Sequence, residues 1–362
     1  MKGLVLAGGT GSRLRPITHT GPKQLVPVAN KPVIQYAIED LRDANITDIG
    51  IVLGEKGRDD IQAFLGDGSE FDVDITYIIQ GEPLGLAHAV GCAKEFVNND
   101  DFVVYLGDNI LKQGIEAFTE SFRNGNYAAG IALQHVDTPE QFGIATVDED
   151  GTVLELTEKP DNPESDLALI GIYVFSPRIF EAIDELEPSW RGELEITDGI
   201  QWLLDQGNAI DSHVVEGWWK DTGKPEDILE ANRLALEESP GEQQGTIESG
   251  ADVRGHLDLH PDAKIEVGAV VRGPVSIDAD TTITDGTYVG PYTSIGPNCL
   301  LKNAHVESSV LIGDCTVTAA DRFVDSLIGS GATIESAEDL LPEGRRLIVG
   351  ENSQLKLLSF ER

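Results

Sequence analysis

The second half of the sequence is organised by a repeat of six residues. From residue 247 onward an aliphatic residue returns at every sixth position, and a small residue follows four positions later in most repeats. The aliphatic positions are Ile247, Val253, Leu259, Ile265, Val271, Ile277, Ile283, Val289, Ile295 and Leu301, and the small ones are Ala251, Ala263, Ala269, Thr281, Thr287, Thr293 and Cys299. A hexapeptide period is typical of a parallel β-helix, whose coils stack their aliphatic residues into one core. We therefore expect a left-handed parallel β-helix over residues 246–350.

The hexapeptide repeat becomes less regular after residue 301. The predicted domain boundaries follow from where the repeat begins and ends. Partial echoes remain at Val306, Ile312, Ile328 and Ile334. The polar, breaker-rich stretch SPGEQQG, residues 239–245, is typical of a linker. The sequence thus predicts a first domain over residues 1–238, this linker, the β-helix, and a C-terminal tail over residues 351–362.

The first domain alternates short strands with amphipathic helices. Strands are predicted at 2–7, 49–53, 75–79, 102–106 and 210–215, the middle three as buried strands. Helices are predicted from Pro32, where Ile34, Ile38 and Leu41 share a face, at 59–65 and at 85–96. This alternation predicts an α/β fold, a doubly wound, Rossmann-like mixed sheet that is mostly parallel. Ligands of such sheets bind beyond the carboxyl ends of the strands.

The chain is strongly acidic, with 63 acidic against 26 basic residues and a formal net charge of -37. Nucleic acids and anionic membrane surfaces require the opposite sign, so neither is an expected partner. The acids are scattered rather than gathered in one tail, which favours a surface adapted to a salt-rich cytoplasm. Three widely spaced cysteines form no disulfide framework, and no apolar run is long enough for a membrane span. We expect a cytoplasmic protein.

The first 38 residues contain no Asp or Glu, although about seven would be expected at the chain's average density. Five basic residues lie in the same segment: Lys2, Arg13, Arg15, Lys23 and Lys31. A buried segment would explain the missing acids but not the added bases. The segment therefore predicts an anion site.

The loop LAGGTGSRLRP within this segment fits neither common phosphate loop. A Walker loop needs Lys and then Ser or Thr after its last glycine, and a dinucleotide fingerprint needs a third glycine where Leu14 stands. Its glycines at 8, 9 and 11 nevertheless allow the backbone to approach an oxyanion closely. Arg13 and Lys23 supply positive charge suited to a triphosphate.

Three later motifs also end strands. YLGDN places Asp108 after a buried strand, and WWKDTG places Asp221 in a turn after another. Two such carboxylates suit Mg²⁺, which prefers one or two carboxylates together with substrate phosphates. LTEKP closes a strand with Glu158 and Lys159, groups suited to sugar hydroxyls and a sugar phosphate. Taken singly, each motif is more often a turn, a helix cap or a surface ion pair than a functional site.

Together these motifs resemble the sugar-1-phosphate nucleotidylyltransferases. LAGGTGSRLRP followed by PKQLVPV is close to that family's signature, and the similarity runs through YLGDN, TEKP, GELEITD (192–198) and WWKDTG. Lys23-Gln24-Leu25 and GELEITD resemble the glucose-1-phosphate thymidylyltransferase branch, and the added β-helix resembles its long form. The resemblance implies transfer from dTTP to glucose 1-phosphate with Mg²⁺ assisting, giving dTDP-glucose and pyrophosphate for glycan synthesis of the rhamnose type.

The resemblance also implies roles for individual residues. Gly8, Gly9, Thr10, Gly11 and Arg13 would hold the triphosphate, and Lys23 would stabilise charge at the α-phosphate. Gln24, Gln80 and Gly85 would read the base. Asp108 and Asp221 would hold the metal, and Gly143, Glu158, Lys159 and Gly171 would hold the glucose and its phosphate. Arg13, Lys23, Asp108 and Lys159 are the candidate catalytic residues.

Some alternatives stay open at this point. His88 stands where short thymidylyltransferases usually carry Gln, and the same histidine occurs in uridylyltransferases specific for N-acetylglucosamine 1-phosphate. A UTP-dependent enzyme is therefore one alternative, with acetyl transfer by the β-helix if His305, in an irregular turn, acts as a base. A non-catalytic assembly subunit of the same architecture is another. Homo-oligomers are expected, because β-helices of this type often form trimers.

Overall fold

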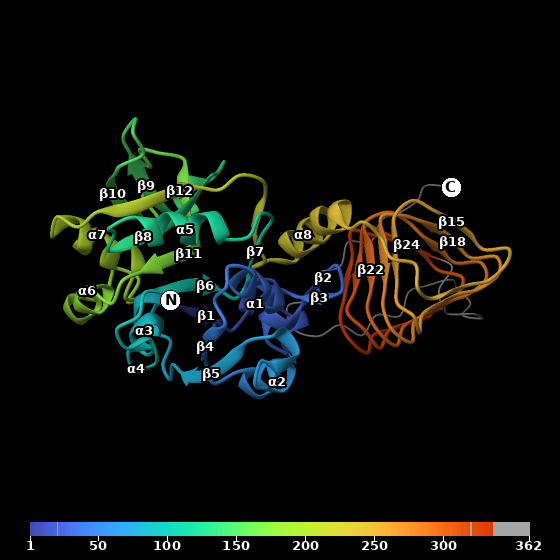
Figure 1. Ribbon diagram of the computed structural model, residues 1–362. Coiled ribbons are helices and arrows are strands. Elements are labelled where there is room, and N and C mark those ends of the chain that lie inside the picture. Colours follow the sequence, from blue (N-terminus) through green and yellow to red (C-terminus); the bar gives the residue numbers. More distant parts are fainter. Residues whose placement is uncertain (20, 319–320, 336–362) are drawn as a thin grey trace. The chain divides into compact units, whose positions relative to one another are not determined.

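The computed structural model describes residues 1–19, 21–318 and 321–335 (Figure 1). By their contacts the residues form two compact units, each with its own hydrophobic core. One unit comprises residues 1–10, 22–25 and 33–221, and the described residues of the other are 11–19, 21, 26–32, 222–318 and 321–335. The predicted domain boundaries stay predictions, and the end of the predicted β-helix domain and the tail at 351–362 lie outside the described residues.

The first unit contains a mixed sheet whose first half is parallel. Strands β1 (Lys2–Leu6), β4 (Asp48–Leu53), β5 (Asp74–Ile79) and β6 (Phe102–Leu106) lie in the order β5-β4-β1-β6. The chain starts in the middle, proceeds to one edge and then crosses to the other side of β1. This reversal between β1 and β6 is the switch point at which open α/β sheets bind ligands.

The second half of the sheet is largely antiparallel. Strand β11 (Leu167–Phe175) pairs antiparallel with β6 and continues the sheet into β8 (Ala129–His135) and β9 (Gly143–Val147). Strand β10 (Val153–Glu158) pairs with β9, and β12 (Ile210–Val214) pairs parallel with β8. The prediction of a Rossmann-like mixed sheet is confirmed, but the expectation that it is mostly parallel is wrong, because antiparallel pairs are as many as parallel ones.

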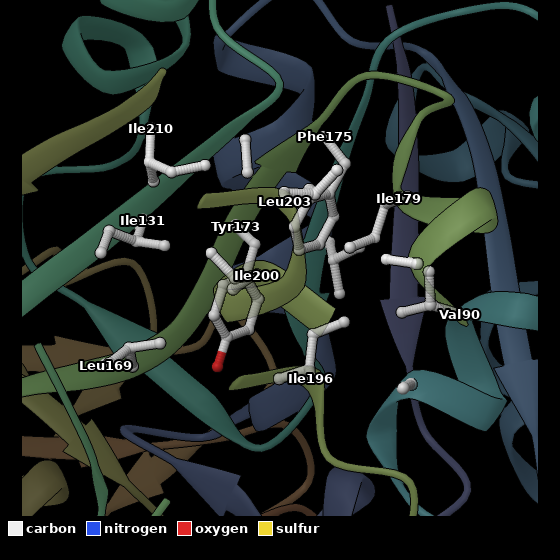
Figure 2. Packing of buried hydrophobic residues seen from close by; sticks show 14 of the residues in the cluster. Val90, Ile131, Leu169, Tyr173, Phe175, Ile179, Ile196, Ile200, Leu203 and Ile210 are labelled. Carbon is white, nitrogen blue, oxygen red and sulfur yellow. The ribbon is translucent and has the colours of Figure 1, made fainter. Parts of the chain in front are cut away.

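Helices cover both faces of this sheet. The helices are α1 (Val33–Asp43), α2 (Arg58–Leu65), α3 (Leu86–Gly91), α4 (Lys94–Val97), α5 (Glu116–Asn124), α6 (Ile179–Glu185) and α7 (Ile196–Asp205). Successive residues of β1 contribute to opposite cores, Leu4 to the core that includes α3, α6 and α7, and Val5 to the core that includes α1, α2 and α5. Figure 2 shows part of the former core, where Tyr173 and Phe175 of β11 lie with Ile200 of α7.

Three details of the first unit differ from the prediction. Strand β5 is not buried, because it is the edge strand, and its Ile79 is 48 % exposed. The helix expected over 85–96 is two short helices, α3 and α4, separated by Cys92 and Ala93. Pro32 lies in a short strand and α1 begins one residue later, although its predicted buried face is correct.

The second unit contains the predicted parallel β-helix, made of three sheets. The strands of its first sheet are β14 (Thr246–Ile247), β17 (Lys264–Ile265), β20 (Thr282–Ile283), β23 (Leu300–Leu301), β26 (Thr316–Thr318) and β29 (Thr333–Glu335). Those of the second are β15 (Asp252–Arg254), β18 (Val270–Arg272), β21 (Tyr288–Val289), β24 (His305–Glu307) and β27 (Arg322–Val324). Those of the third are β16 (Leu257–Leu259), β19 (Val275–Ile277), β22 (Thr293–Ile295), β25 (Val310–Leu311) and β28 (Leu327–Ile328). All these pairings are parallel, as the hexapeptide period predicts.

The repeat loosens after residue 301 because the coils of the β-helix become shorter there. Ile283 pairs with Leu301, three hexapeptides on, but Ile295 pairs with Leu311, two residues sooner. Leu311 is therefore buried, and Ile312, predicted as a core residue, lies only partly buried beside it. The stacked core continues because residues are removed from the turns and not from the strands. Each aliphatic side chain so buried contributes roughly 1.5–3 kcal/mol.

His305 does not lie in an irregular turn, as predicted, but on strand β24. Its ring lies 6.1 Å from that of Tyr288 in an edge-on arrangement, in an open groove bordered by Glu307 and Arg322. None of the helices in the described ranges is both long and apolar enough to cross a membrane.

Candidate active site

The glycine loop after β1 is closely packed against polar side chains. A Cβ atom on Gly8 would lie 2.7 Å from Gln80 Oε1, and one on Gly9 would lie 3.0 Å from Lys23 Cε. Side chains at these two positions would displace the amide and the lysine. The glycines therefore bring the main chain directly against Gln80 and Lys23, at the carboxyl end of β1.

Lys23 and Asp108 form an ion pair at the switch point of the sheet. The Lys23 ammonium donates to Asp108 Oδ2, and the two side chains are only 14 % and 13 % exposed. Asp108 follows β6, the neighbour of β1, and its preceding residue is held to β1 by a bond from Gly107 N to Leu6 O at 3.0 Å. The two residues that the sequence predicted at separate motifs thus meet between the two strands.

Asp221 does not lie in a turn, as predicted, but ends a short strand of a second, two-stranded sheet. Strands β7 (Asn109–Leu111) and β13 (Trp219–Asp221) pair antiparallel, with Asp221 opposite Asn109. Within the described residues no set of three or more His, Cys, Asp or Glu side chains is grouped to hold a metal alone. The carboxylates of Asp221 and of Asp108, the residue before its strand partner Asn109, are nevertheless ligands of the kind that Mg²⁺ prefers, because this ion completes its oxygen ligands with water and substrate phosphates.

The predicted base-reading residues lie around the same loop. Gln24 is 1 % exposed, and its Oε1 accepts no hydrogen bond from any residue in the described ranges. Gln80 Nε2 lies 3.5 Å from Gly85 O and 3.4 Å from His88 Nδ1. A buried amide oxygen without a donor is costly in the folded chain alone. This arrangement suits a ligand that donates a hydrogen bond.

A second polar cluster surrounds Glu158 at the end of β10. Gly143 lies opposite Glu158 in the strand register, and a Cβ there would lie 2.6 Å from Thr197 Cγ2. Glu158 Oε2 accepts from Thr197 Oγ1 at 3.1 Å, and Glu158 Oε1 lies 3.5 Å from the Lys159 ammonium. The predicted Glu158 and Lys159 pair is thus part of a larger network.

Arg191 is a member of this network that the sequence interpretation did not single out. Its guanidinium lies 3.3 Å from Glu158, 3.3 Å from Glu195 and 3.1 Å from Glu193. Glu195 is 4 % exposed, and burial raises the pKa of its carboxyl despite a hydrogen bond from Ser189. The signal was present, since Arg191 directly precedes GELEITD and is the one base in an acidic stretch.

The segment that carries Arg191 also contacts the loop that contains Gly85, one of the predicted base-reading residues. Leu194 N donates to Leu84 O at 2.8 Å, and Ala87 N donates to Leu194 O at 3.0 Å. Gly85 lies between them with φ +113°, and a Cβ there would lie 2.4 Å from Leu194 O. The two polar clusters are therefore connected by main-chain hydrogen bonds.

The contact with Asn109 is the reason why residue 171 is a glycine. Asn109 is a second residue that the sequence interpretation did not single out. Gly171 has φ +79°, and a Cβ on it would lie 2.4 Å from Asn109 Nδ2. Asn109 is 2 % exposed and donates to Ile170 O at 2.5 Å. This contact ties β11 to the strand that follows Asp108.

Three predicted residues are not brought into these clusters. Thr10 is exposed at the end of the loop, and Gly11 and Arg13 belong by their contacts to the second unit. Gly11 has φ +61° and accepts a bond from Thr18 Oγ1 at 2.6 Å, and Arg13 is exposed. Their predicted contact with a triphosphate stays a prediction.

An ionisable group beneath the site predicts a pH-dependent stability. Tyr105 on β6 is fully buried and donates to Asp40 Oδ2 at 2.8 Å. Desolvation raises the pKa of Asp40 to about 7, with smaller contributions from the nearby carboxylates Glu116, Asp43 and Glu39. The pKa of Asp40 is therefore higher in the folded than in the unfolded protein. Its contribution to the stability of the fold is complete below about pH 4, where the carboxyl is protonated in both states. This contribution is lost as the pH rises to about 7 and the buried carboxyl ionises.

An Asp40→Asn variant is expected to remove this dependence. Relative to the variant, the wild type should lose on the order of 2–4 kcal/mol of unfolding free energy between pH 4 and pH 8, since the amide has no charge to bury. Urea unfolding of both proteins at constant high salt measures the difference. A difference that does not change with pH would contradict the prediction.

A family model matches the first domain of this chain, and known proteins are similar to it over almost its whole length. The nucleotidyl transferase family model matches residues 2–238. The low-salt glycan biosynthesis nucleotidyltransferase Agl11 of Haloferax volcanii is 68 % identical over 357 residues, 99 % of this chain and 100 % of that protein. A glucose-1-phosphate thymidylyltransferase of Streptomyces griseus is 45 % identical over 359 residues, again 99 % and 100 % of the two chains.

A solved structure is similar to about two thirds of this chain. It is a Bacillus anthracis protein described as a glucose-1-phosphate thymidylyltransferase, 44 % identical, with a TM-score of 0.63 over 67 % of this chain and 98 % of that one. The chain belongs to the nucleotidyl transferase family.

Proposed function

We propose that the protein transfers a thymidylyl group from dTTP to glucose 1-phosphate, producing dTDP-glucose and pyrophosphate for glycan synthesis. A phosphate oxygen of glucose 1-phosphate forms a bond to the α-phosphorus of dTTP, and the bond to the β-phosphate oxygen breaks. The observation that carries the proposal is the Lys23 and Asp108 pair below Gly9 at the switch point of the sheet. Full-length similarity to a thymidylyltransferase and to a glycan nucleotidyltransferase supports the choice of substrates.

Lys23 is the group proposed to stabilise the transferred phosphoryl group. Nucleotidyl transfer needs no protein nucleophile, so positioning and charge provide most of the catalysis. An ammonium held within a largely buried site, where the dielectric is low, acts more strongly on developing negative charge than one in water. Gly8 and Gly9 are proposed to let main-chain N–H groups reach the phosphates, with Thr10, Gly11 and Arg13 adding contacts.

Asp108 and Asp221 are proposed to hold Mg²⁺. When bound, the ion neutralises phosphate charge and polarises the phosphoryl oxygens. Asp108 also accepts from Lys23, so one carboxylate orients the lysine and carries a ligand oxygen. Binding of Mn²⁺ as a spectroscopic substitute should weaken in an Asp221→Asn variant, which tests this pair without an activity measurement.

The remaining roles are proposed from the two polar clusters. Gln24, Gln80 and Gly85 would recognise the base, since the buried Gln24 Oε1 accepts no hydrogen bond within the described residues and a pyrimidine N3–H is a donor. Gly143, Glu158, Lys159 and Gly171 would hold the sugar phosphate. A homo-oligomer and a cytoplasmic location are also proposed, and light scattering of the purified protein tests the former.

The experiment is pyrophosphate release from a matrix of dTTP or UTP with glucose, N-acetylglucosamine or galactose 1-phosphate, in high salt. The expected result is highest kcat/KM for dTTP with glucose 1-phosphate. A clear preference for UTP would replace the substrate assignment, and no release from any pair would favour a non-catalytic role. Acetyl-CoA turnover in the same preparation tests the β-helix for acetyl transfer.

A further inference from the structure

A short hairpin connects the segment of Lys23 to helix α1. Its strands are β2 (Pro27–Val28) and β3 (Lys31–Pro32), and both turn residues have positive φ, 49° at Ala29 and 62° at Asn30. By its contacts this hairpin belongs to the same unit as the β-helix, whereas residues 22–25 belong to the other. An isolated two-stranded hairpin is at best marginally stable, so its conformation depends on what it contacts.

The first contact is with helix α8 (Pro225–Glu238), through Asn232, which is 0 % exposed. Asn232 Oδ1 accepts from Ala29 N at 2.9 Å and from Ser294 Oγ at 2.6 Å. Its Nδ2 donates to Tyr292 O at 3.0 Å. One buried amide therefore joins the hairpin turn, α8 and strand β22 of the β-helix.

The second contact is between the hairpin tip and the β-helix itself. Asn30 Nδ2 donates to Ser276 Oγ on β19 at 2.9 Å and to Ile295 O on β22 at 3.0 Å. Ser276 is 7 % exposed and Ile295 is fully buried. Figure 1 marks the elements that meet here as β2, β3, α8 and β22. Together, Asn30 and Asn232 make five hydrogen bonds at the turn, each with a typical net contribution of about 1 kcal/mol.

The chain between this turn and Lys23 is short. Only Gln24, Leu25 and Val26 separate Lys23 from β2, and Gln24 and Val26 are almost fully buried. Because only three residues connect them along the chain, a displacement of the hairpin is expected to displace Lys23. Catalysis of phosphoryl transfer depends on the position of the charged group to within about 1 Å.

We propose that the β-helix is a positioning element for nucleotidyl transfer, and that Asn30 and Asn232 are its positioning residues, which fix the hairpin and through it Lys23. The inference rests on the proposed function for its kinetic consequence. It gives the β-helix a role that needs no chemistry of its own.

The test variant is Asn30→Gly, because glycine adopts the positive φ of this turn readily and removes only the two bonds to the β-helix. The kcat with dTTP and glucose 1-phosphate should fall about tenfold, with KM for glucose 1-phosphate changed by less than about twofold. Amide exchange of residues 28–31, the hairpin residues between Pro27 and Pro32, should become faster. Ser276→Ala, which removes one acceptor from the β-helix side, should show the same pattern with a smaller effect, and serves if Asn30→Gly does not fold.

The matched control is Thr281→Val, which removes two buried hydrogen bonds from the β-helix, those with Gly296 O at 2.7 Å and Cys299 N at 2.9 Å, but does not touch the hairpin. This variant should be less stable and keep the wild-type kcat. Wild-type kcat in Asn30→Gly, or an equal loss in Thr281→Val, would overturn the proposal. If the wild type itself releases no pyrophosphate, the proposed function fails, and unchanged hairpin exchange in Asn30→Gly would separately refute the positioning role.

Discussion

A Lys23→Ala variant is expected to release pyrophosphate about a hundred- to a thousandfold more slowly than the wild type, with its fold intact. The ammonium lies against Gly9 and on Asp108, in a site where both side chains are almost 90 % buried. Its removal takes away the positive charge proposed to stabilise the α-phosphate and leaves Asp108 without this ion-pair partner. Single-turnover rates with dTTP and glucose 1-phosphate measure the effect on the chemical step.

Lys94→Ala is the matched control for this variant. Lys94 also pairs with an aspartate, Asp184 at 2.8 Å, but both side chains are more than half exposed and lie outside the site. An exposed ion pair contributes little to stability and nothing to the site, so this variant should retain wild-type rates. The proposed mechanism is wrong if Lys23→Ala is as active as the control.

Patterns that repeat along the chain were enough to predict the architecture. The spacing of six residues predicted the β-helix because each coil must place an aliphatic residue inward at the same point. The run from Ile295 to Leu311 shows the limit of this reasoning. Two turns, each shortened by one residue, keep the core stacked but change which residue faces it, and Ile312 was predicted in place of Leu311.

Charge and glycine patterns predicted several residues that the structure brings into the two polar clusters, but not all members of these clusters. The acid-free segment pointed to Lys23, and the strand ends pointed to Asp108, which the structure pairs with it. Arg191 was missed because its partners, Glu158 and Glu195, are close only after β10 and α7 have packed. Contacts between residues as distant as Asn30 and Ile295 carry no local sequence signal at all.

A Gly85→Ala variant is expected to lower kcat/KM for dTTP at least about a hundredfold. Gly85 has φ +113° and ψ 174°, a conformation open almost only to glycine. An added Cβ would lie 2.4 Å from Leu194 O and 2.6 Å from Leu194 N, and neither is a side chain that can rotate away. The loop must therefore separate from the segment of Arg191 and lose the two bonds between Leu194 and residues 84 and 87.

Gly81→Ala is the control that distinguishes the effect of this steric clash from the effect of backbone strain alone. Gly81 lies in the same loop with φ +70°, but a Cβ there meets nothing within 4 Å. This control should cost only about 1 kcal/mol of unfolding free energy and leave kcat/KM within about twofold of the wild type. Urea unfolding and dTTP titrations of both variants give the comparison. If the two variants have equal kcat/KM, contact between the Gly85 loop and Leu194 has no part in nucleotide binding; if only Gly85→Ala is impaired, the two polar clusters depend on each other through the main chain.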